Sequence, residues 1–116
     1  MTKPFKKSLK HIPREDAHGW AGARKLLLSE TDDISHNLEA FTLGFLEPGW
    51  VFDWHMHEGI DEFFIVTQWV WTIEFEDETR FAYQAWDVIY NPAWLKHRIE
   101  NTWDEENQFY FVRFVA

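Results

Sequence analysis

The residues of this chain best suited to chemistry are two histidines separated by a single position. His55 and His57 lie in the stretch WHMHEGIDEFF, and the acidic residue Glu62 follows five positions after the second histidine. Because residues i and i+2 of a β-strand point to the same face, the two imidazoles are expected to project together. If the next residues form the second strand of a hairpin, Glu62 faces the pair across the turn. A third imidazole, that of His97, lies much later, in the stretch NPAWLKHRIEN.

Three imidazoles and one carboxylate form a ligand set for a divalent transition metal. Such a set suits Mn, Fe, Ni or Zn and leaves coordination positions open for water or a small molecule. The chain has no cysteine, so thiolate ligands are excluded. Two histidines at this spacing also occur as surface or hydrogen-bonded residues, and the pair alone leaves that alternative open. The remaining histidines are interpreted as surface residues: His11, His18 and His36.

Strands with a period of two must position these side chains. Short runs rich in β-branched and aromatic residues lie at 41–46, 62–67, 71–76, 80–83, 87–90 and 108–115. Turn-forming residues separate the runs at intervals of about ten residues, which is typical of an antiparallel sandwich or barrel. The sequence therefore predicts an all-β fold. Residues 1–37 lack this pattern apart from a strand expected at 24–30, so we expect one domain with an N-terminal arm (1–37) packed on a barrel (38–116).

The predicted strand faces also indicate the surroundings of the histidines. Asp53 shares the face of His55, and Phe64 shares that of Glu62. Asp53 and Tyr90 are the candidates for a further acid or base, with a structural role as the alternative for each. No catalytic residue is assigned. The aromatic strands favour a largely apolar cavity for a small ligand, with a lining expected to include Asp53, Phe64, Trp94 and Ile99.

A longer pattern around these residues resembles the two motifs of the cupin family. The first motif is glycine, five residues, His-x-His, three or four residues, glutamate, six residues and glycine. This chain has Gly49, five residues, His55 and His57, four residues, then Glu62, and has Trp69 where the last glycine is expected.

The second cupin motif is matched with two further departures. Its histidine and asparagine correspond to His97 and Asn101, and its proline to Pro92, whereas Trp86 and Trp94 stand where the motif has glycines. The resemblance covers residues 40–115. It implies a double-stranded β-helix, or jelly-roll, barrel in which one metal ion is bound by four residues: His55, His57, Glu62 and His97.

The chain is rich in tryptophan, and three of its eight tryptophans replace motif glycines. A residue other than glycine at positive φ costs roughly 1–2 kcal/mol, whereas a buried aromatic ring returns about 1.5–3 kcal/mol. Either the turns keep positive φ with its strain, or they have changed type and the rings are buried. We expect the second, with at least one of Trp69 and Trp86 packed on apolar neighbours. Trp94, three residues before His97, is expected to narrow or line the pocket entrance. Whether the substitutions are natural or engineered stays open.

Basic and acidic residues are unevenly distributed along the chain. Seven of the eleven Lys and Arg residues lie in residues 1–25, which carry a net charge of +5 within a chain of net charge −9. The acidic remainder repels phosphate, so we expect no nucleic-acid partner and interpret the basic segment as lying on its own acidic barrel. No apolar run approaches the roughly 18 residues of a membrane span, and no leader pattern is present, so a cytoplasmic protein is expected.

Function is less constrained than fold. The first hypothesis is a metal-dependent enzyme of dioxygenase, isomerase or lyase type that acts on a small polar organic molecule. The alternatives are a non-catalytic module that binds a metal or small ligand, and a barrel whose turns were rebuilt with tryptophan. The apolar terminal segment FYFVRFVA carries one charge and is interpreted as an exposed edge strand, which predicts a homodimer. Neither the metal nor the substrate follows from the sequence.

Overall fold

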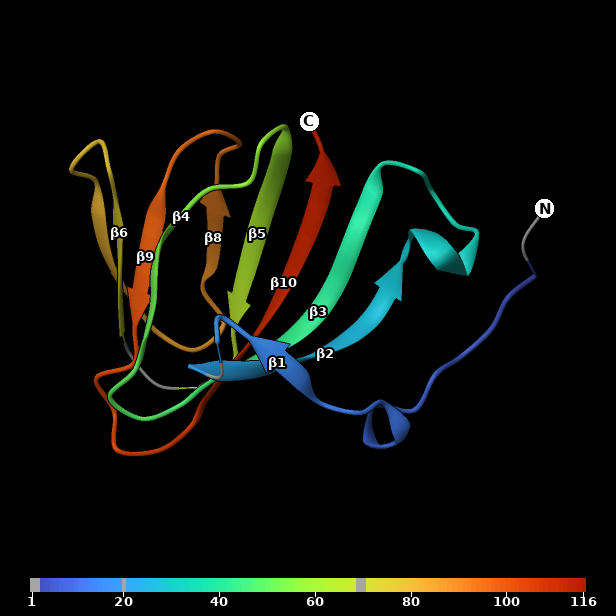
Figure 1. Ribbon diagram of the computed structural model, residues 1–116, viewed down its shortest axis with the longest axis horizontal. Coiled ribbons are helices and arrows are strands. Elements are labelled where there is room, and N and C mark those ends of the chain that lie inside the picture. Colours follow the sequence, from blue (N-terminus) through green and yellow to red (C-terminus); the bar gives the residue numbers. More distant parts are fainter. Residues whose placement is uncertain (1–2, 20, 69–70) are drawn as a thin grey trace.

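The computed structural model describes residues 3–19, 21–68 and 71–116, and its strands form two antiparallel sheets (Figure 1). The larger sheet has, in spatial order, β1 (Glu15–Ala17), β2 (Gly22–Ser29), β3 (Leu38–Leu46), β10 (Asn107–Val115), β5 (Ile60–Val66) and β8 (Val88–Asn91). The smaller sheet has β4 (Val51–His55), β9 (His97–Glu100), β6 (Trp71–Phe75) and β7 (Arg80–Tyr83). Two short 3-10 helices, η1 (Leu9–His11) and η2 (Glu30–Asp32), complete the described elements. The all-β prediction is confirmed.

Alternation along the strands places the core between the sheets. In β5, Glu62, Phe64 and Val66 are buried while the intervening residues are partly exposed. β9 repeats this pattern with His97 and Ile99. The apolar residues of these inward faces join one cluster with residues from both sheets, among them Leu46, Ile73 and Phe109. The candidate ligands Glu62 and His97 therefore occupy core positions rather than surface ones.

β10 lies inside the larger sheet and not at its edge. Its residues pair with β3 on one side and with β5 on the other. The interpretation of FYFVRFVA as an exposed edge strand is therefore wrong, because its backbone groups already have partners on both sides. The homodimer remains a prediction, but an exposed edge strand no longer supports it.

The N-terminal segment adds two strands to the larger sheet and covers part of its outer face. β2 pairs along β3, and β1 forms a hairpin with β2. Ile12 packs on a second apolar cluster that includes Leu27 and Phe45. The Arg14 guanidinium lies 3.7 Å from the centroid of the Phe45 ring. The hairpin matters for the site described below, because its turn carries His18.

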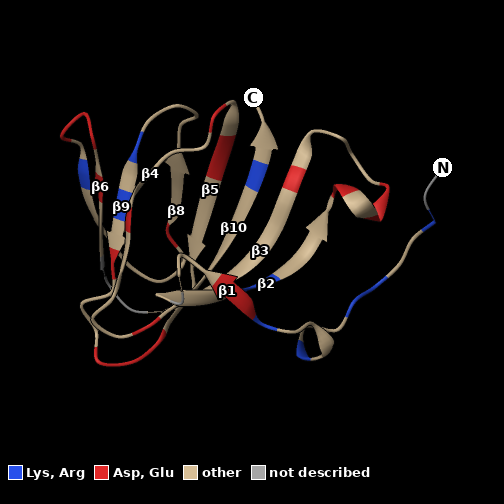
Figure 2. Ribbon diagram, viewed as in Figure 1, with Lys and Arg blue, Asp and Glu red and all other residues tan. Residues whose placement is uncertain are grey.

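The basic segment makes ion pairs within the chain. Figure 2 shows Lys and Arg recurring before β2 and acidic residues gathered in loops of the remainder. Arg14 pairs with Glu106 at 2.8 Å, and Lys7 pairs with Asp32 at 2.8 Å. Within the described ranges, no helix combines the length and apolar character that a membrane crossing requires.

The tryptophans at motif glycine positions lie in strained, exposed turns. Trp86 has φ 73° and is 74% exposed, and Trp94 has φ 71° and is 60% exposed. Each is the third residue of a four-residue turn closed by a backbone hydrogen bond, as Gly49 is in the turn 47–50 with φ 73°. The expectation of altered turns with buried rings is thus wrong for Trp86 and Trp94: the turns keep the glycine conformation. Trp69 lies outside the described residues.

Candidate metal centre

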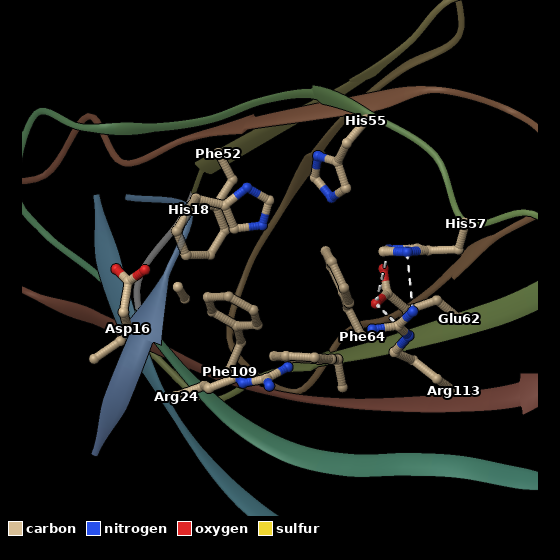
Figure 3. Close-up of a pocket in the computed structure, with 13 residues that line it drawn as sticks. Asp16, His18, Arg24, Phe52, His55, His57, Glu62, Phe64, Phe109 and Arg113 are labelled. Atoms are coloured by element: carbon tan, nitrogen blue, oxygen red, sulfur yellow. Dashed lines mark hydrogen bonds and ion pairs between the residues drawn. The ribbon is translucent and has the colours of Figure 1, made fainter. Parts of the chain in front are cut away.

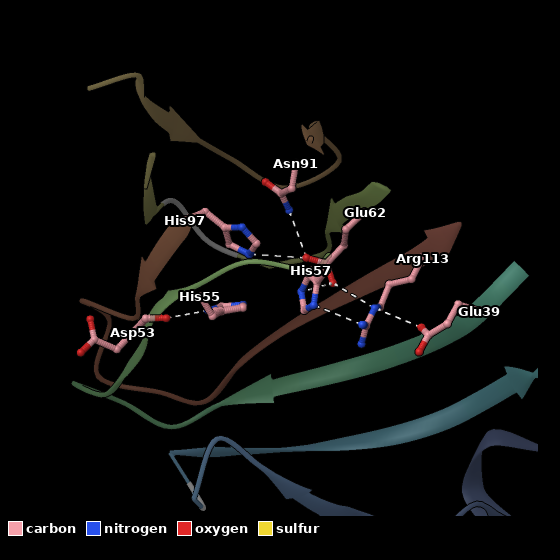
Figure 4. Close-up of polar contacts among 8 residues, drawn as sticks. All are labelled: Glu39, Asp53, His55, His57, Glu62, Asn91, His97 and Arg113. Atoms are coloured by element: carbon pink, nitrogen blue, oxygen red, sulfur yellow. Dashed lines mark hydrogen bonds and ion pairs between the residues drawn. The ribbon is translucent and has the colours of Figure 1, made fainter. Parts of the chain in front are cut away.

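Two rows of polar side chains from opposite sheets form the centre of the site (Figure 4). In the larger sheet, Glu62 on β5 pairs with Arg113 on β10 and with Asn91 on β8. In the smaller sheet, His55 on β4 is the direct cross-strand partner of His97 on β9. Strand register therefore brings together residues that are far apart in sequence.

His55 is oriented by its own strand. Its Nδ1 lies 2.6 Å from the carbonyl oxygen of Asp53. Because a carbonyl can only accept, Nδ1 carries the proton and Nε2 keeps its lone pair. An imidazole that donates to a backbone carbonyl through one nitrogen and offers the other is the usual arrangement of a metal-binding histidine.

A bulge in β4 explains why Asp53 is not on the inner face. Phe52 pairs with Ile99 and His55 pairs with His97, so between these two pairs β4 contains one more residue than β9. Phe52 and His55 consequently both face inward, and the side chain of Asp53 is 74% exposed. Its carboxylate lies 3.5 Å from Arg98 Nε on the outside. The expected alternation through Asp53 does not hold across the bulge.

His57 follows β4 in a turn and contacts both Glu62 and Arg113. Its Nε2 lies 3.4 Å from Glu62 Oε2. On the other side, Arg113 Nη2 lies 3.1 Å from His57 Nδ1. Since a guanidinium can only donate, Nδ1 accepts and the ring proton is on Nε2, directed at the carboxylate. The carbonyl of His57 accepts from the backbone N–H groups of Ile60 and Trp94, which ties this turn to the one that precedes β9.

His97 is the most deeply buried of the three imidazoles, at 1% exposure. Its Nε2 lies 3.5 Å from Glu62 Oε1 and makes no hydrogen bond within the described part of the chain. Burial, with the neighbouring His55, lowers the pKa of His97 to about 3. The ring is therefore neutral, and a buried nitrogen without a partner is available for a ligand.

Glu62 stays ionised in this environment. Burial alone would raise the pKa of its carboxyl, but His57, His97 and Arg113 outweigh that effect and hold it below the ordinary value. Asn91 Nδ2 donates to Oε1 at 3.3 Å. The carboxylate therefore lies between two imidazoles with its charge retained.

The donor set fits a divalent transition metal. One nitrogen from each of His55, His57 and His97 lies within 4.8 Å of the others, and the Glu62 carboxylate contacts two of these rings. Neutral imidazoles and an ionised carboxylate are the protonation states that ligation requires. The structure brings together all four residues that the sequence pattern singled out.

A cavity of about 210 Å³ opens beside this cluster (Figure 3). Its apolar wall consists mainly of four phenylalanines: Phe52, Phe64, Phe109 and Phe111. Its polar wall includes the side chains of His18, Arg24, His55, His57, Glu62 and Arg113. The cavity thus has an aromatic side and a charged side that carries the imidazoles.

Of the four residues expected to line the pocket, only Phe64 lies in the wall of this cavity. Ile99 is fully buried in the core, and the side chain of Asp53 points outward because of the bulge. Trp94 is exposed in its turn rather than at the cavity wall. These three positions are corrections to the sequence interpretation. Tyr90, the other acid-base candidate, donates to Asp61 on an exposed face.

Among the cavity residues that the sequence interpretation missed, His18 and Arg113 lie beside the candidate ligands. His18 was interpreted as a surface residue, yet its ring stacks on Phe52 at 4.3 Å and lies 4.7 Å from the His55 ring. No periodic signal marked it, because it lies in the hairpin turn. Arg113 did carry a signal: it continues the inward face of Phe109 and Phe111, and a charge on an apolar face indicates a buried partner.

The family comparison decides the identity of the fold. The family model described as "Cupin domain" matches residues 43–113. The chain belongs to the cupin family. The two antiparallel sheets of this cupin are accordingly the predicted double-stranded β-helix, or jelly-roll, barrel. No curated protein matches the sequence.

Solved structures resemble this cupin over nearly its whole length. A predicted oxalate decarboxylase from Thermotoga maritima has a TM-score of 0.85 at 20% identity, covering 97% of this chain and 100% of the other. The polyketide cyclase RemF from Streptomyces resistomycificus has a TM-score of 0.81 at 12% identity, covering 98% and 81%. The cupin domain of Schizosaccharomyces pombe Cnp3 has a TM-score of 0.78 at 14% identity, covering 96% and 74%. At these identities the likeness establishes the fold alone.

Proposed function

We propose that this cupin holds one divalent transition metal ion through His55, His57, His97 and Glu62, and that it is an enzyme acting on a small organic molecule. The observation that carries the proposal is the convergence of three imidazoles beside a buried, ionised carboxylate at the wall of a cavity. Mn, Fe, Ni and Zn all suit such a set of nitrogen and oxygen ligands. When bound, the ion supplies Lewis acidity to an oxygen of the substrate.

The residues of the chain supply position and environment for that chemistry. The Asp53 carbonyl fixes the ring of His55 so that Nε2 is presented to the ion. Asn91 orients the carboxylate of Glu62. The phenylalanine wall excludes water from one side of the cavity and leaves the other side for polar groups of the substrate. Two similar structures, described as a predicted oxalate decarboxylase and a polyketide cyclase, are consistent with an enzyme on this fold.

Elemental analysis of protein purified without added metal tests the metal centre. We expect about one transition metal ion per chain, and its loss in the His97→Ala variant. His36→Ala is the matched control, because His36 is exposed and does not line the cavity. A parent protein that takes up no Mn, Fe, Ni or Zn even after dialysis against each ion would overturn the proposal.

Turnover separates an enzyme from a binding module. Metal-loaded protein can be incubated in air with a panel of small organic acids, alcohols and sugars, and loss of each compound followed by NMR. Consumption that disappears on chelation and in His97→Ala supports the enzyme. Stable metal binding with no compound consumed supports the non-catalytic alternative instead.

A further inference from the structure

The size of the cavity restricts its ligand. Pockets for drug-sized molecules measure roughly 300–1,000 Å³, whereas this cavity measures about 210 Å³. A ligand that also reaches the imidazole cluster is therefore limited to a single ring or a short chain.

One side of the cavity is lined by aromatic rings that are tilted relative to one another, by 45° for Phe64 and Phe109 and by 31° for Phe109 and Phe111. Phe64 and Phe109 lie 5.3 Å apart, and Phe109 and Phe111 lie 5.7 Å apart, measured between ring centroids. Opposite the sheet that carries them, His18 stacks on Phe52 with an interplanar angle of 22°. Aromatic faces and edges in this arrangement favour another planar ring over an aliphatic chain.

His18 is held over the cavity at a conformational cost. Its φ is 53°, in the region that favours glycine, and the following Gly19 has φ 66°. A residue in this conformation persists where surrounding contacts maintain it, and such residues concentrate at ligand sites. The hairpin that carries His18 lies outside residues 43–113, so this wall is contributed by a part of the chain beyond the family match.

Two guanidinium groups lie at the polar wall of the cavity. Arg24 and Arg113 balance Asp16 and Glu62 among the lining residues. Two further carboxylates lie beside them, Glu15 at 2.8 Å from Arg24 Nε and Glu39 at 3.1 Å from Arg113 Nε, and the two charges of a divalent ion on the imidazoles would balance this pair. The net charge therefore does not select an anion, and a ligand carboxylate needs a specific donor at the wall.

Arg113 is placed to donate to such a carboxylate. Its side chain is 18% exposed, and its Nη2 donates to His57 Nδ1. When His57 binds a metal ion through Nε2, its ring proton resides on Nδ1. Nδ1 then has no free lone pair and can no longer accept a hydrogen bond from Arg113. One guanidinium N–H then needs a new acceptor at the cavity wall, and a carboxylate provides it.

We propose that the cavity binds a small aromatic carboxylate, with the carboxylate at Arg113 and the metal centre and the ring between the phenylalanines and His18. This inference rests on the proposed function, since it uses the same metal-loaded site.

Calorimetric titration of zinc-loaded protein with three probes tests the ligand class. Benzoate has both ring and carboxylate, acetate has only the carboxylate, and benzyl alcohol has only the ring. We expect benzoate to bind at least tenfold more tightly than either of the others, and its affinity to fall when zinc is removed with EDTA. Equal affinities for benzoate and acetate, or no benzoate binding to zinc-loaded protein, would overturn the inference.

Single variants test the role of each cavity wall in benzoate binding. His18→Ala should weaken benzoate binding by roughly three- to tenfold, the size of one lost aromatic contact, and leave zinc content unchanged. His36→Ala, the control, should change neither. Arg113→Gln should weaken benzoate binding roughly 10- to 100-fold, with partial recovery in Arg113→Lys.

The outcomes separate this inference from the proposed function. Zinc bound at one ion per chain with no preference for benzoate leaves the metal centre standing and refutes the ligand class. Failure of the parent protein to bind any of the four metals refutes both. If Arg113→Gln does not fold, the comparison of probes on the parent protein and the His18→Ala variant still decide the question.

Discussion

At the residue scale, the site depends on neutral histidines packed around one charged carboxylate. Burial lowers the pKa of His97 to about 3 and, with the neighbouring imidazoles, that of His18 to about 4. Burial also lowers the pKa of His55. Glu62 remains ionised among them. The shifts of His55, His97 and Glu62 favour metal ligation, and all four shifts link the stability of the metal-free protein to pH.

The metal-free protein should lose stability in mild acid. Below pH 6.5 an unfolded His97 binds a proton that the folded residue, with its pKa of about 3, does not. The free energy of unfolding is therefore not reduced by His97 above pH 6.5, and it falls progressively as the pH drops from 6.5 towards 3. At pH 5 the loss from His97 alone is about 2 kcal/mol. The depressed pKa of Glu62 adds to the loss at still lower pH.

Urea unfolding in EDTA at pH 7.5 and pH 5 measures this effect. The dependence should be weaker in His97→Gln, because that side chain does not titrate, and unchanged in His36→Ala. A parent protein equally stable at both pH values would mean that the buried histidines do not govern its acid sensitivity.

The carboxylate should be required for tight metal binding. Glu62→Gln keeps the size of the side chain but removes its charge between His57 and His97. We expect the affinity for Zn²⁺, measured by calorimetry, to fall by roughly 10- to 100-fold or more. Glu58→Gln is the matched control, because Glu58 is an exposed acid in the adjacent turn. Equal losses in both variants would point to general electrostatics rather than ligation.

At the element scale, turns and bulges determine the direction of side chains that strand alternation alone does not predict. Trp86 and Trp94 occupy turns with the conformation of the Gly49 turn, and their rings are largely exposed. The strain of positive φ is therefore retained, while little burial compensates for it.

Replacing either tryptophan with glycine should stabilise the protein by about 1 kcal/mol. The reverse comparison is Gly49→Ala, where an added Cβ meets no neighbouring atom, so that only the strain at φ 73° is introduced. This variant should be destabilised by a similar amount. Thermal denaturation of the three single variants checks both signs, and a loss of several kcal/mol in Trp86→Gly would indicate that its ring packs on neighbours.

The same elements show why the sequence predicted some site residues and not others. Glu62 and Phe64 lie in an unbroken strand, so a period of two placed both on the inner face. Asp53 was misplaced because one extra residue in β4 reverses the alternation between Phe52 and His55. His18 could not be found from periodicity, because a turn residue reaches the cavity only through the three-dimensional path of the hairpin. The four candidate metal ligands could be predicted without knowledge of the three-dimensional path, because their spacing matches the family motifs.

At the scale of the whole molecule, the proposed ligands connect the two sheets. His55 and His97 belong to the smaller sheet, while Glu62 belongs to the larger. An ion held by all of them would link the two layers of the barrel directly. Metal binding should therefore act on global stability and not only on the local turn.

Zinc should raise the unfolding temperature of the parent protein. At a free concentration 100 times its dissociation constant, a ligand that binds only the folded state stabilises by about 2.7 kcal/mol. For a chain of this size that corresponds to roughly 10 °C. Differential scanning fluorimetry with and without Zn²⁺ measures the shift, which should be absent in His97→Ala. An unfolding temperature that does not respond to zinc in the parent protein would contradict a site that joins the sheets.

The interior position of β10 has a consequence for biosynthesis. β3 and β5 both pair with this strand, and 41 positions separate the end of β5 at Val66 from the start of β10 at Asn107. At translation rates of about 5–20 residues per second, a nascent chain spends roughly 2–8 s with these two strands made and their shared partner not yet synthesised. Unpaired strand edges are prone to aggregate. The yield of folded protein should therefore be sensitive to chaperone supply and to slow codons in the interval between β5 and β10.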